Sequence, residues 1–179
     1  AGDLVNNDGV HIVLVASTPD TVAPVADQCE ALETPCLSDD CPWQPYVLSR
    51  SGGDIKAEFN WTYHFFWGLE DIIGNFQDVW AQVPNNKVVG ALWPNDADGN
   101  AYRGEFGPAL TANGFQVIDP GAYQNATEDF TAQINAFKTA GCEIITGVPI
   151  PPDATNFMKQ ASQQGLKPKI ITLAKALLF

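Results

Sequence analysis

Apolar residues recur along the chain in two alternating patterns, which predict strands and helices in turn. The β-branched run Val10–Ala16 has the composition and length of a buried parallel strand. Apolar residues then recur every three or four positions up to about Glu33, the spacing of one helix face. Cys36–Ser38 predicts a second short strand, and Tyr46–Ser49 is expected to be extended after an irregular, proline-containing stretch.

The middle of the chain continues this alternation. The aromatic run Trp61–Trp67 predicts a strand, and the apolar stripe from Leu69 to Val83 predicts a helix. Further strands are expected to start at Val88, Phe115, Glu143 and Lys169, with helices near 99–113, 127–140 and 153–164. A period of about 27 residues is typical of strand–helix–strand units. The sequence therefore predicts an α/β fold, with parallel sheets that carry helices on both faces.

The charge balance excludes two classes of partner. The 179 residues include 9 basic and 21 acidic side chains, for a formal net charge of −12. Nucleic acids and anionic membranes both select basic surfaces, so neither is an expected partner. No apolar run reaches the roughly 18 residues of a membrane span, so we expect no direct membrane insertion. With 45% hydrophobic and only 17% charged residues, the chain is expected to fold.

The four cysteines do not have the spacing of a zinc site. Cys29, Cys36 and Cys41 cluster, whereas Cys142 stands apart. Cys29 falls in the last turns of a predicted helix and Cys36 begins the next strand. We therefore predict a Cys29–Cys36 disulfide, which would indicate an oxidising compartment, and a free, buried thiol at Cys142.

No arrangement of residues indicates catalysis or a cofactor. The sequence has no nucleophile elbow, no P-loop and no dinucleotide-binding glycine motif. His11 and His64 are both expected to be packed, hydrogen-bonded core histidines. The loop that starts at Asp96 fails as a calcium site, because Ala101 and Gly107 stand where glycine and glutamate are required. We therefore expect no catalytic residue, no metal and no cofactor.

Candidate binding residues follow the ends of the predicted strands, where open parallel sheets bind their ligands. Ser17 and Thr18 precede a helix, so they could bind a carboxylate or simply cap that helix. Trp67 could form a stacking wall for a ligand or pack in the core. The other strand ends carry Ser38, Asp39 and Asp40, then Asp96 and Asp98, then Gly147–Pro151, and finally Lys175.

The order of these segments resembles a known family. The segments are the strand that ends at Ala16–Thr18, Pro35–Ser38, Val88–Gly99, Tyr123 with Thr127–Phe130, Cys142–Thr146 and Gln164–Lys169. Together they resemble type I periplasmic binding proteins of the branched-chain amino-acid (Leu/Ile/Val-binding) type, which are solute receptors of ABC transporters. The resemblance implies two α/β lobes joined by hinge strands, with the solute between them. Residues 1–58 would be part of lobe 1 and residues 59–179 would form lobe 2 with hinge strands, so this chain would be a fragment.

The resemblance also implies a set of ligand-binding residues. With Trp67, which is a candidate from its place near a strand end, the ligand-binding residues are Ser17, Thr18, Ser38, Asp39, Trp67, Asp98, Pro149 and Lys175. Asp39 and the loop around Asp98 depart from the family pattern, which has small or hydroxyl residues at the first place and an aromatic at the second. The family's acidic residue for an amino group is expected near Ala174, where this chain has Lys175 instead. This departure favours a solute with a carboxylate or amide at the Ser17–Thr18 end and a less acidic, partly apolar body against Trp67.

The implied function is solute delivery without catalysis. The chain would belong to the extracytoplasmic solute-binding component of an ABC transporter, with a membrane permease as its partner. It would be periplasmic or extracellular and membrane-associated through the transporter, with the signal peptide outside this chain. A ligand-sensing domain of a regulator or receptor with the same fold is the alternative, and an α/β enzyme is a third class.

Overall fold

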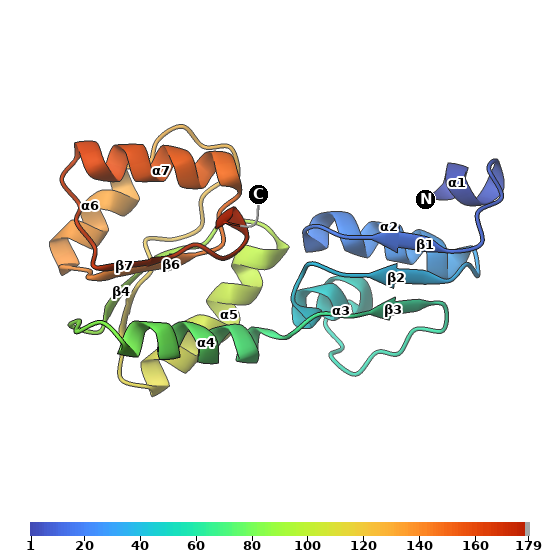
Figure 1. Cartoon of the computed structure of the whole chain (residues 1–179), viewed down its shortest axis with the longest axis horizontal. Helices are drawn as coiled ribbons and strands as arrows, with labels where there is room; N and C mark the ends of the chain where they lie inside the picture. Colours follow the sequence, from blue (N-terminus) through green and yellow to red (C-terminus); the bar gives the residue numbers. More distant parts are fainter. Residues whose placement is uncertain (178–179) are drawn as a thin grey trace. The chain divides into compact units, whose positions relative to one another are not determined.

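The structure is a computed structural model that describes residues 1–177 and forms two compact units, Ala1–Leu69 and Glu70–Phe179. Each unit has its own parallel sheet with helices packed on it (Figure 1). The strand at Thr62–His64 pairs within the first sheet, and the first unit accordingly extends to Leu69. None of the described helices is long and apolar enough to span a membrane.

The first unit contains three helices and three strands among its described residues. In chain order they are α1 (Gly2–Asn6), β1 (Val13–Val15), α2 (Pro19–Ala31), β2 (Cys36–Ser38), α3 (Trp43–Ser51) and β3 (Thr62–His64). The strands are parallel in the order β1-β2-β3, with Leu14, Leu37 and Tyr63 side by side in the register. The side chains of α2 and α3 pack on one face, where Val22, Ala26 and Tyr46 form a buried cluster.

One element of the first unit differs from the sequence prediction. Residues 46–49 were expected to be extended, but they lie inside α3. Pro45 is in the first turn of this helix, where a backbone N–H has no helical partner and a proline therefore costs no hydrogen bond. Gly52 then ends the helix in the left-handed conformation, with a φ of 66°.

The second unit follows the predicted strand–helix period. In chain order it contains α4 (Leu69–Ala81), β4 (Val88–Leu92), α5 (Ala97–Ala112), β5 (Gln116–Ile118), α6 (Thr131–Ala140), β6 (Ile144–Gly147), α7 (Pro151–Gln163), β7 (Ile170–Thr172) and a short 3-10 helix η1 (Ala174–Leu177). The strands are all parallel in the order β5-β4-β6-β7. The prediction of a parallel sheet over residues 88–172 is therefore confirmed.

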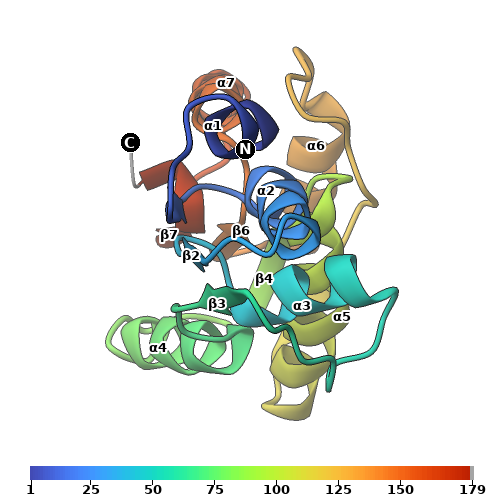
Figure 2. The ribbon, with the colours of Figure 1, turned by 90° about the vertical axis from the view of Figure 1, so that its right-hand side faces the viewer.

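Helices cover both faces of this second sheet. Figures 1 and 2 show α6 and α7 on one side and α4 on the other. On the first side, the rings of Phe130, Phe137 and Phe157 pack against one another in a buried cluster that includes Leu92 and Ile145. This packing fixes the loops that follow β4, β6 and β7, which carry the candidate binding residues of the unit.

Candidate functional site

The loop after β1 begins with a strained backbone. Ser17 has a φ of 123°, a conformation that residues other than glycine rarely adopt. Thr18 is the N-cap residue of α2, but its side chain makes no capping hydrogen bond, and Pro19 occupies the first turn. The Thr18 hydroxyl therefore does not serve as a helix cap in this structure. The two hydroxyl residues instead lie beside the positive end of a 13-residue helix.

The loop after β2 is tied to β3 by a partly buried chain of hydrogen bonds. The ring Nε2 of His64 donates to the carbonyl oxygen of Cys41 at 2.8 Å, so its Nδ1 accepts from the Ser38 hydroxyl at 2.8 Å. The ring of His64 also stacks on Tyr46. Burial lowers the pKa of His64 below its usual value, and the ring is neutral in this arrangement. The prediction of a packed histidine is right for His64, whereas His11 is exposed and lies outside β1.

The three remaining candidates of the first unit differ in exposure. Ser38 is fully buried, so its hydroxyl holds the loop through His64. Asp39 is exposed, and its carboxylate accepts from the backbone N–H of Asp40 at 2.7 Å. Trp67 is 60% exposed and contacts the ring of Phe66 at a centroid distance of 4.5 Å. Core packing is thus excluded for Trp67, and its ring is available for stacking.

An ion-pair cluster lies at the carboxyl ends of β4 and β7 in the second unit. The Nζ of Lys175 is 2.7 Å from a carboxylate oxygen of Asp98 and 3.6 Å from one of Asp96. All three side chains are nearly buried. Asp96 also caps α5 by accepting from the backbone N–H of Gly99 at 2.7 Å. The structure therefore brings together Asp98 and Lys175, which lie 77 residues apart in the sequence.

Three further polar residues extend this cluster, and sequence reasoning did not assign them to it. Asn125 donates to Asp96 at 2.8 Å, and the buried Asp153 accepts from the backbone N–H of Ala126 at 3.1 Å. Burial raises the pKa of Asp153, and the nearby Asp96 adds to this effect. The Tyr123 hydroxyl is buried without a hydrogen-bond partner, and burial followed by the charges of Asp153 and Asp96 raises its pKa.

Pro149 lies in the loop after β6 and is buried. The loop begins at Gly147, where an added Cβ would come within 2.4 Å of the Leu92 carbonyl oxygen. Only glycine therefore allows β6 to approach β4 this closely at the strand ends. Pro149 shapes the loop between β6 and α7 and contributes no polar group.

The cysteines correct one prediction and confirm another. Cys29 and Cys36 are free thiols that lie in one small core cluster, so the expected disulfide is not formed. Burial, followed by the proximity of Cys29, raises the pKa of Cys36 to about 12, which keeps this thiol protonated. Cys142 is a free, buried thiol as predicted, and burial raises its pKa to about 11.

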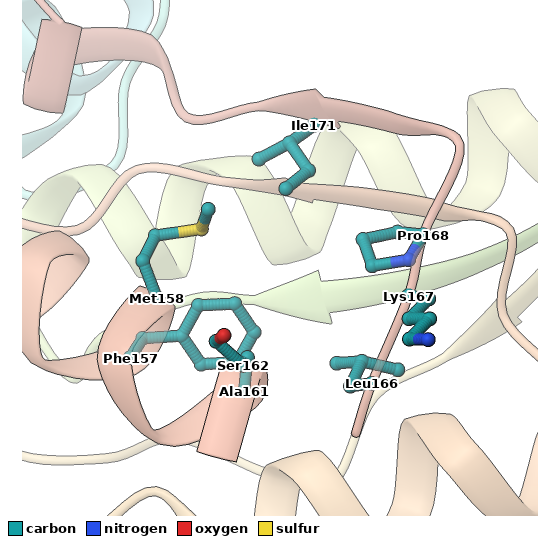
Figure 3. Close-up of a pocket in the computed structure, with 8 residues that line it drawn as sticks. All are labelled: Phe157, Met158, Ala161, Ser162, Leu166, Lys167, Pro168 and Ile171. Carbon is teal, nitrogen blue, oxygen red and sulfur yellow. The ribbon is translucent and has the colours of Figure 1, made fainter. Parts of the chain in front are cut away.

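A separate apolar cavity of about 130 Å³ lies beside α7 and β7 (Figure 3). Phe157, Met158 and Ile171 line it, together with Leu166 and Pro168 from the segment that precedes β7. It therefore extends toward the amino end of β7, away from the candidate residues at the strand carboxyl ends. We do not assign the solute to this cavity.

Comparison with known proteins supports one family. The family model described as "Periplasmic binding protein" matches residues 1–179. No curated protein sequence matches the chain. Several solved structures share the fold at low sequence identity.

Three of these structures illustrate the similarity. A solute-binding protein of an ABC transporter from R. palustris, in complex with 4-hydroxybenzoate, has a TM-score of 0.73 and 11% identity over 98% of this chain and 46% of its own. A solute-binding protein of an ABC transporter from Rhodopseudomonas palustris BisB5, in complex with 3,4-dihydroxy benzoic acid, has a TM-score of 0.67 and 21% identity. The match covers 95% of this chain and 44% of that structure. A branched chain amino acid ABC transporter periplasmic ligand-binding protein from Burkholderia xenovorans LB400 has a TM-score of 0.67 and 18% identity. The match covers 96% of this chain and 45% of that structure. The chain thus spans less than half the length of each of these structures.

Proposed function

Because this chain belongs to the periplasmic binding protein family, we propose that it is part of the extracytoplasmic solute-binding component of an ABC transporter. The observation that carries the proposal is the match of the family model over residues 1–179. The gathering of polar residues at the carboxyl ends of both sheets supports it, because ligands of parallel α/β sheets bind there. The unit Ala1–Leu69 would belong to one lobe of the receptor and the unit Glu70–Phe179 to the other.

The proposed partners follow from this role. A small solute binds to the receptor, and the loaded receptor delivers it to a membrane permease. The protein would act in the periplasm or outside the cell and would reach the membrane through that permease. Binding and release would need no catalytic residue and no cofactor.

The first unit favours a carboxylate or amide group of the solute. Ser17 and Thr18 carry hydroxyls beside the amino end of α2, and helix amino ends stabilise negative charge. The exposed ring of Trp67 offers a flat surface for the apolar body of the solute. Asp39 would lie at the margin of this surface. The buried Ser38 would hold the loop in place through its hydrogen bond to His64.

The second unit favours a different group. Asp96 and Asp98 carry two negative charges against the one positive charge of Lys175, so this cluster has a formal charge of −1. A second carboxylate would be repelled there, whereas a hydroxyl or amino group could donate a hydrogen bond to Asp98.

These preferences describe a small carboxylic acid that carries a hydroxyl or amino group at its other end. The ligands of two similar proteins, 4-hydroxybenzoate and 3,4-dihydroxy benzoic acid, have this arrangement of groups. A third similar protein is a branched chain amino acid ABC transporter periplasmic ligand-binding protein. An α-amino acid carries its amino group beside the carboxylate and does not have this arrangement, and the absence of an acidic residue near Ala174 in the sequence also argues against it. We propose acids with the hydroxyl or amino group at the other end as the class of solute for the present chain.

A thermal-shift screen of the full-length protein tests the proposal. The probes are 4-hydroxybenzoate, leucine, benzamide and, as a control without a carboxylate or amide, phenol. A ligand at about 100 times its Kd stabilises the native state by about 2.7 kcal/mol and raises the Tm accordingly. We expect a carboxylate or amide probe to raise the Tm and phenol to leave it unchanged. Absence of a shift with every acid and amide would count against the proposed solute class.

A further inference from the structure

The partly buried ring of His64 lies at the carboxyl end of the first sheet. Val15, Ser38 and His64 are partners in the register of β1, β2 and β3, so they form one row across the sheet. The loop that carries Ser17 and Thr18 begins directly after this row. The ring therefore stands at the same end of the sheet as the proposed carboxylate site.

The hydrogen bonds around this ring can be satisfied in two protonation states. In the neutral state, Nε2 donates to the carbonyl oxygen of Cys41 and Nδ1 accepts from the Ser38 hydroxyl, each at 2.8 Å. The Ser38 oxygen is also 3.2 Å from the carbonyl oxygen of Tyr63, which is a second acceptor for the hydroxyl. When the ring gains a proton, Nδ1 donates to the Ser38 oxygen and the Ser38 hydroxyl donates to Tyr63. The ring thus gains a positive charge while each of these groups keeps a partner.

Charged groups influence this ring from the neighbouring loop and from α3. Burial lowers the pKa of the ring most strongly; its hydrogen bond to a backbone carbonyl and the carboxylate of Asp39 raise it, and the guanidinium of Arg50 lowers it. Tyr46 of α3 stacks on the ring at a centroid distance of 4.2 Å. From α2, Asp27 and Glu30 pair with Arg50 and offset its charge. The ring is therefore uncharged at neutral pH and becomes charged in acidic solution.

A carboxylate at this end of the sheet would enter a strongly acidic unit. Residues 1–69 carry ten acidic and two basic side chains, for a formal charge of −8. Of the two basic side chains, Arg50 is buried and paired with Asp27, and Lys56 lies in the segment between α3 and β3. The partial positive charge at the amino end of α2 is thus opposed by the charge of the whole unit. A protonated His64 would add one positive charge at the end of the sheet where the carboxylate binds.

We propose that protonation of His64 tightens the binding of a carboxylate at this end of the first sheet, so that solute binding responds to pH. This inference rests on the proposed function, because it needs an anionic group of the solute beside Ser17 and Thr18. By linkage, the bound carboxylate favours the protonated ring to the same extent, so binding takes up protons. Acidic solution then favours capture of the solute, and neutral solution favours its release.

Titration calorimetry of the full-length protein from about pH 5 to about pH 8 tests this coupling. The probes are 4-hydroxybenzoate and its uncharged analogue 4-hydroxybenzamide. The proteins are wild type, His64→Gln and, as a matched control, His11→Gln, because His11 is exposed and lies outside β1. Glutamine keeps a donor and an acceptor but gains no charge. The ratio of the Kd values of two proteins at each pH cancels the ionisation of the probe itself.

We expect the benzoate to bind wild type at least about threefold more tightly at the acidic end of this range, relative to His64→Gln, than at the other end. His11→Gln should follow wild type, and the benzamide should show the same Kd ratio at every pH. A second measurement, NMR titration of the His64 ring in sodium acetate and in sodium chloride of equal concentration, needs neither benzoate nor a variant. Acetate should raise the apparent pKa of His64 and leave that of His11 unchanged.

Three outcomes would overturn the inference. A constant Kd ratio between wild type and His64→Gln, with the benzoate bound, would remove the coupling and leave the proposed solute class intact. The same pH dependence for the benzoate and the benzamide would show that the ring acts on the fold and not on the charge of the solute. Equal titration of His64 in acetate and chloride would refute the coupling even if neither benzene derivative binds, whereas failure of every acid and amide to bind counts against the proposed function.

Discussion

Ser17 combines backbone strain with a position at a strand end. Its φ of 123° costs about 1–3 kcal/mol for a residue with a Cβ, and such strain gathers at binding sites. We expect Ser17→Gly to raise the free energy of unfolding by about 1 kcal/mol, because glycine adopts this conformation without a steric penalty. Ser17→Ala, which keeps the Cβ, should change it by no more than about 0.5 kcal/mol.

Urea denaturation of the three proteins measures both effects. The two variants lose the same hydroxyl, so a difference between them reports the backbone alone. Equal stabilities for Ser17→Gly and Ser17→Ala would show that the turn stores no strain.

Asp153 gives the stability of the second unit a defined pH dependence. Burial raises its folded pKa above the unfolded value, which is about 3.9. The folded state therefore binds the proton more tightly, so this contribution is complete below the unfolded pKa. It is lost as the pH rises through the folded pKa.

Asp153→Asn removes this titration while it keeps an oxygen that can accept from the Ala126 N–H. We expect the stability of the variant relative to wild type to increase from pH 4 to pH 8. The measurement is urea denaturation at several pH values, with the exposed Asp78→Asn as the control. A difference that is constant with pH, or that falls as the pH rises, would refute the assignment.

At the scale of elements, the buried side chain of Arg50 joins α2, α3 and β3 in the first unit. Its guanidinium forms an ion pair with Asp27 at 2.7 Å and donates to the Thr62 hydroxyl at 2.8 Å. It also lies over the ring of Phe59, 3.7 Å from the centroid. These contacts hold the long segment between α3 and β3 against α2.

We expect Arg50→Met to lower the free energy of unfolding by at least about 2 kcal/mol, since it removes charge-assisted hydrogen bonds whose partners stay partly buried. Arg50→Lys should not restore the loss, because an ammonium cannot make the same set of planar contacts. The exposed Lys56→Met serves as the control and should change stability by less than about 0.5 kcal/mol. Wild-type stability of Arg50→Met in urea denaturation would contradict this role.

The sequence predicted the elements of the second unit well because each of its strands is a short apolar run between amphipathic helices. The strands start within one residue of the expected positions Val88, Phe115, Glu143 and Lys169. The sequence predicted an extended segment where the structure has α3. Pro42 and Pro45 would break the interior of a helix, but they lie at its start, where prolines are tolerated.

The candidate site was predictable only in part. Parallel strands end at one edge of a sheet, so the sequence alone placed Ser17, Asp98 and Lys175 at strand ends. It could not show that Lys175 pairs with Asp98, or that Asp153 approaches Asp96, because these contacts join distant parts of the chain. For Cys29 and Cys36 the sequence predicted correctly that the two side chains lie close together. It predicted the disulfide between them wrongly, because both thiols are free.

At the scale of the whole molecule, the two units repeat one design. Each has a parallel sheet whose carboxyl ends carry the polar residues, and helices alternate with the strands along the chain. The chain belongs to the periplasmic binding protein family, and we propose that the solute binds at these edges. The central claim is therefore that residues such as Ser17 bind the solute directly.

Titration calorimetry of the full-length protein tests this claim most directly. The ligand is the acid or amide that gives the largest thermal shift, and the proteins are wild type, Ser17→Ala and, as a control on α3, Ser49→Ala. A hydrogen bond to a charged group contributes about 1.5–3 kcal/mol, so we expect Ser17→Ala to raise the Kd at least several-fold at nearly unchanged stability. Ser49→Ala should bind like wild type. An unchanged Kd for Ser17→Ala would contradict the assignment of the solute to this edge of the sheet.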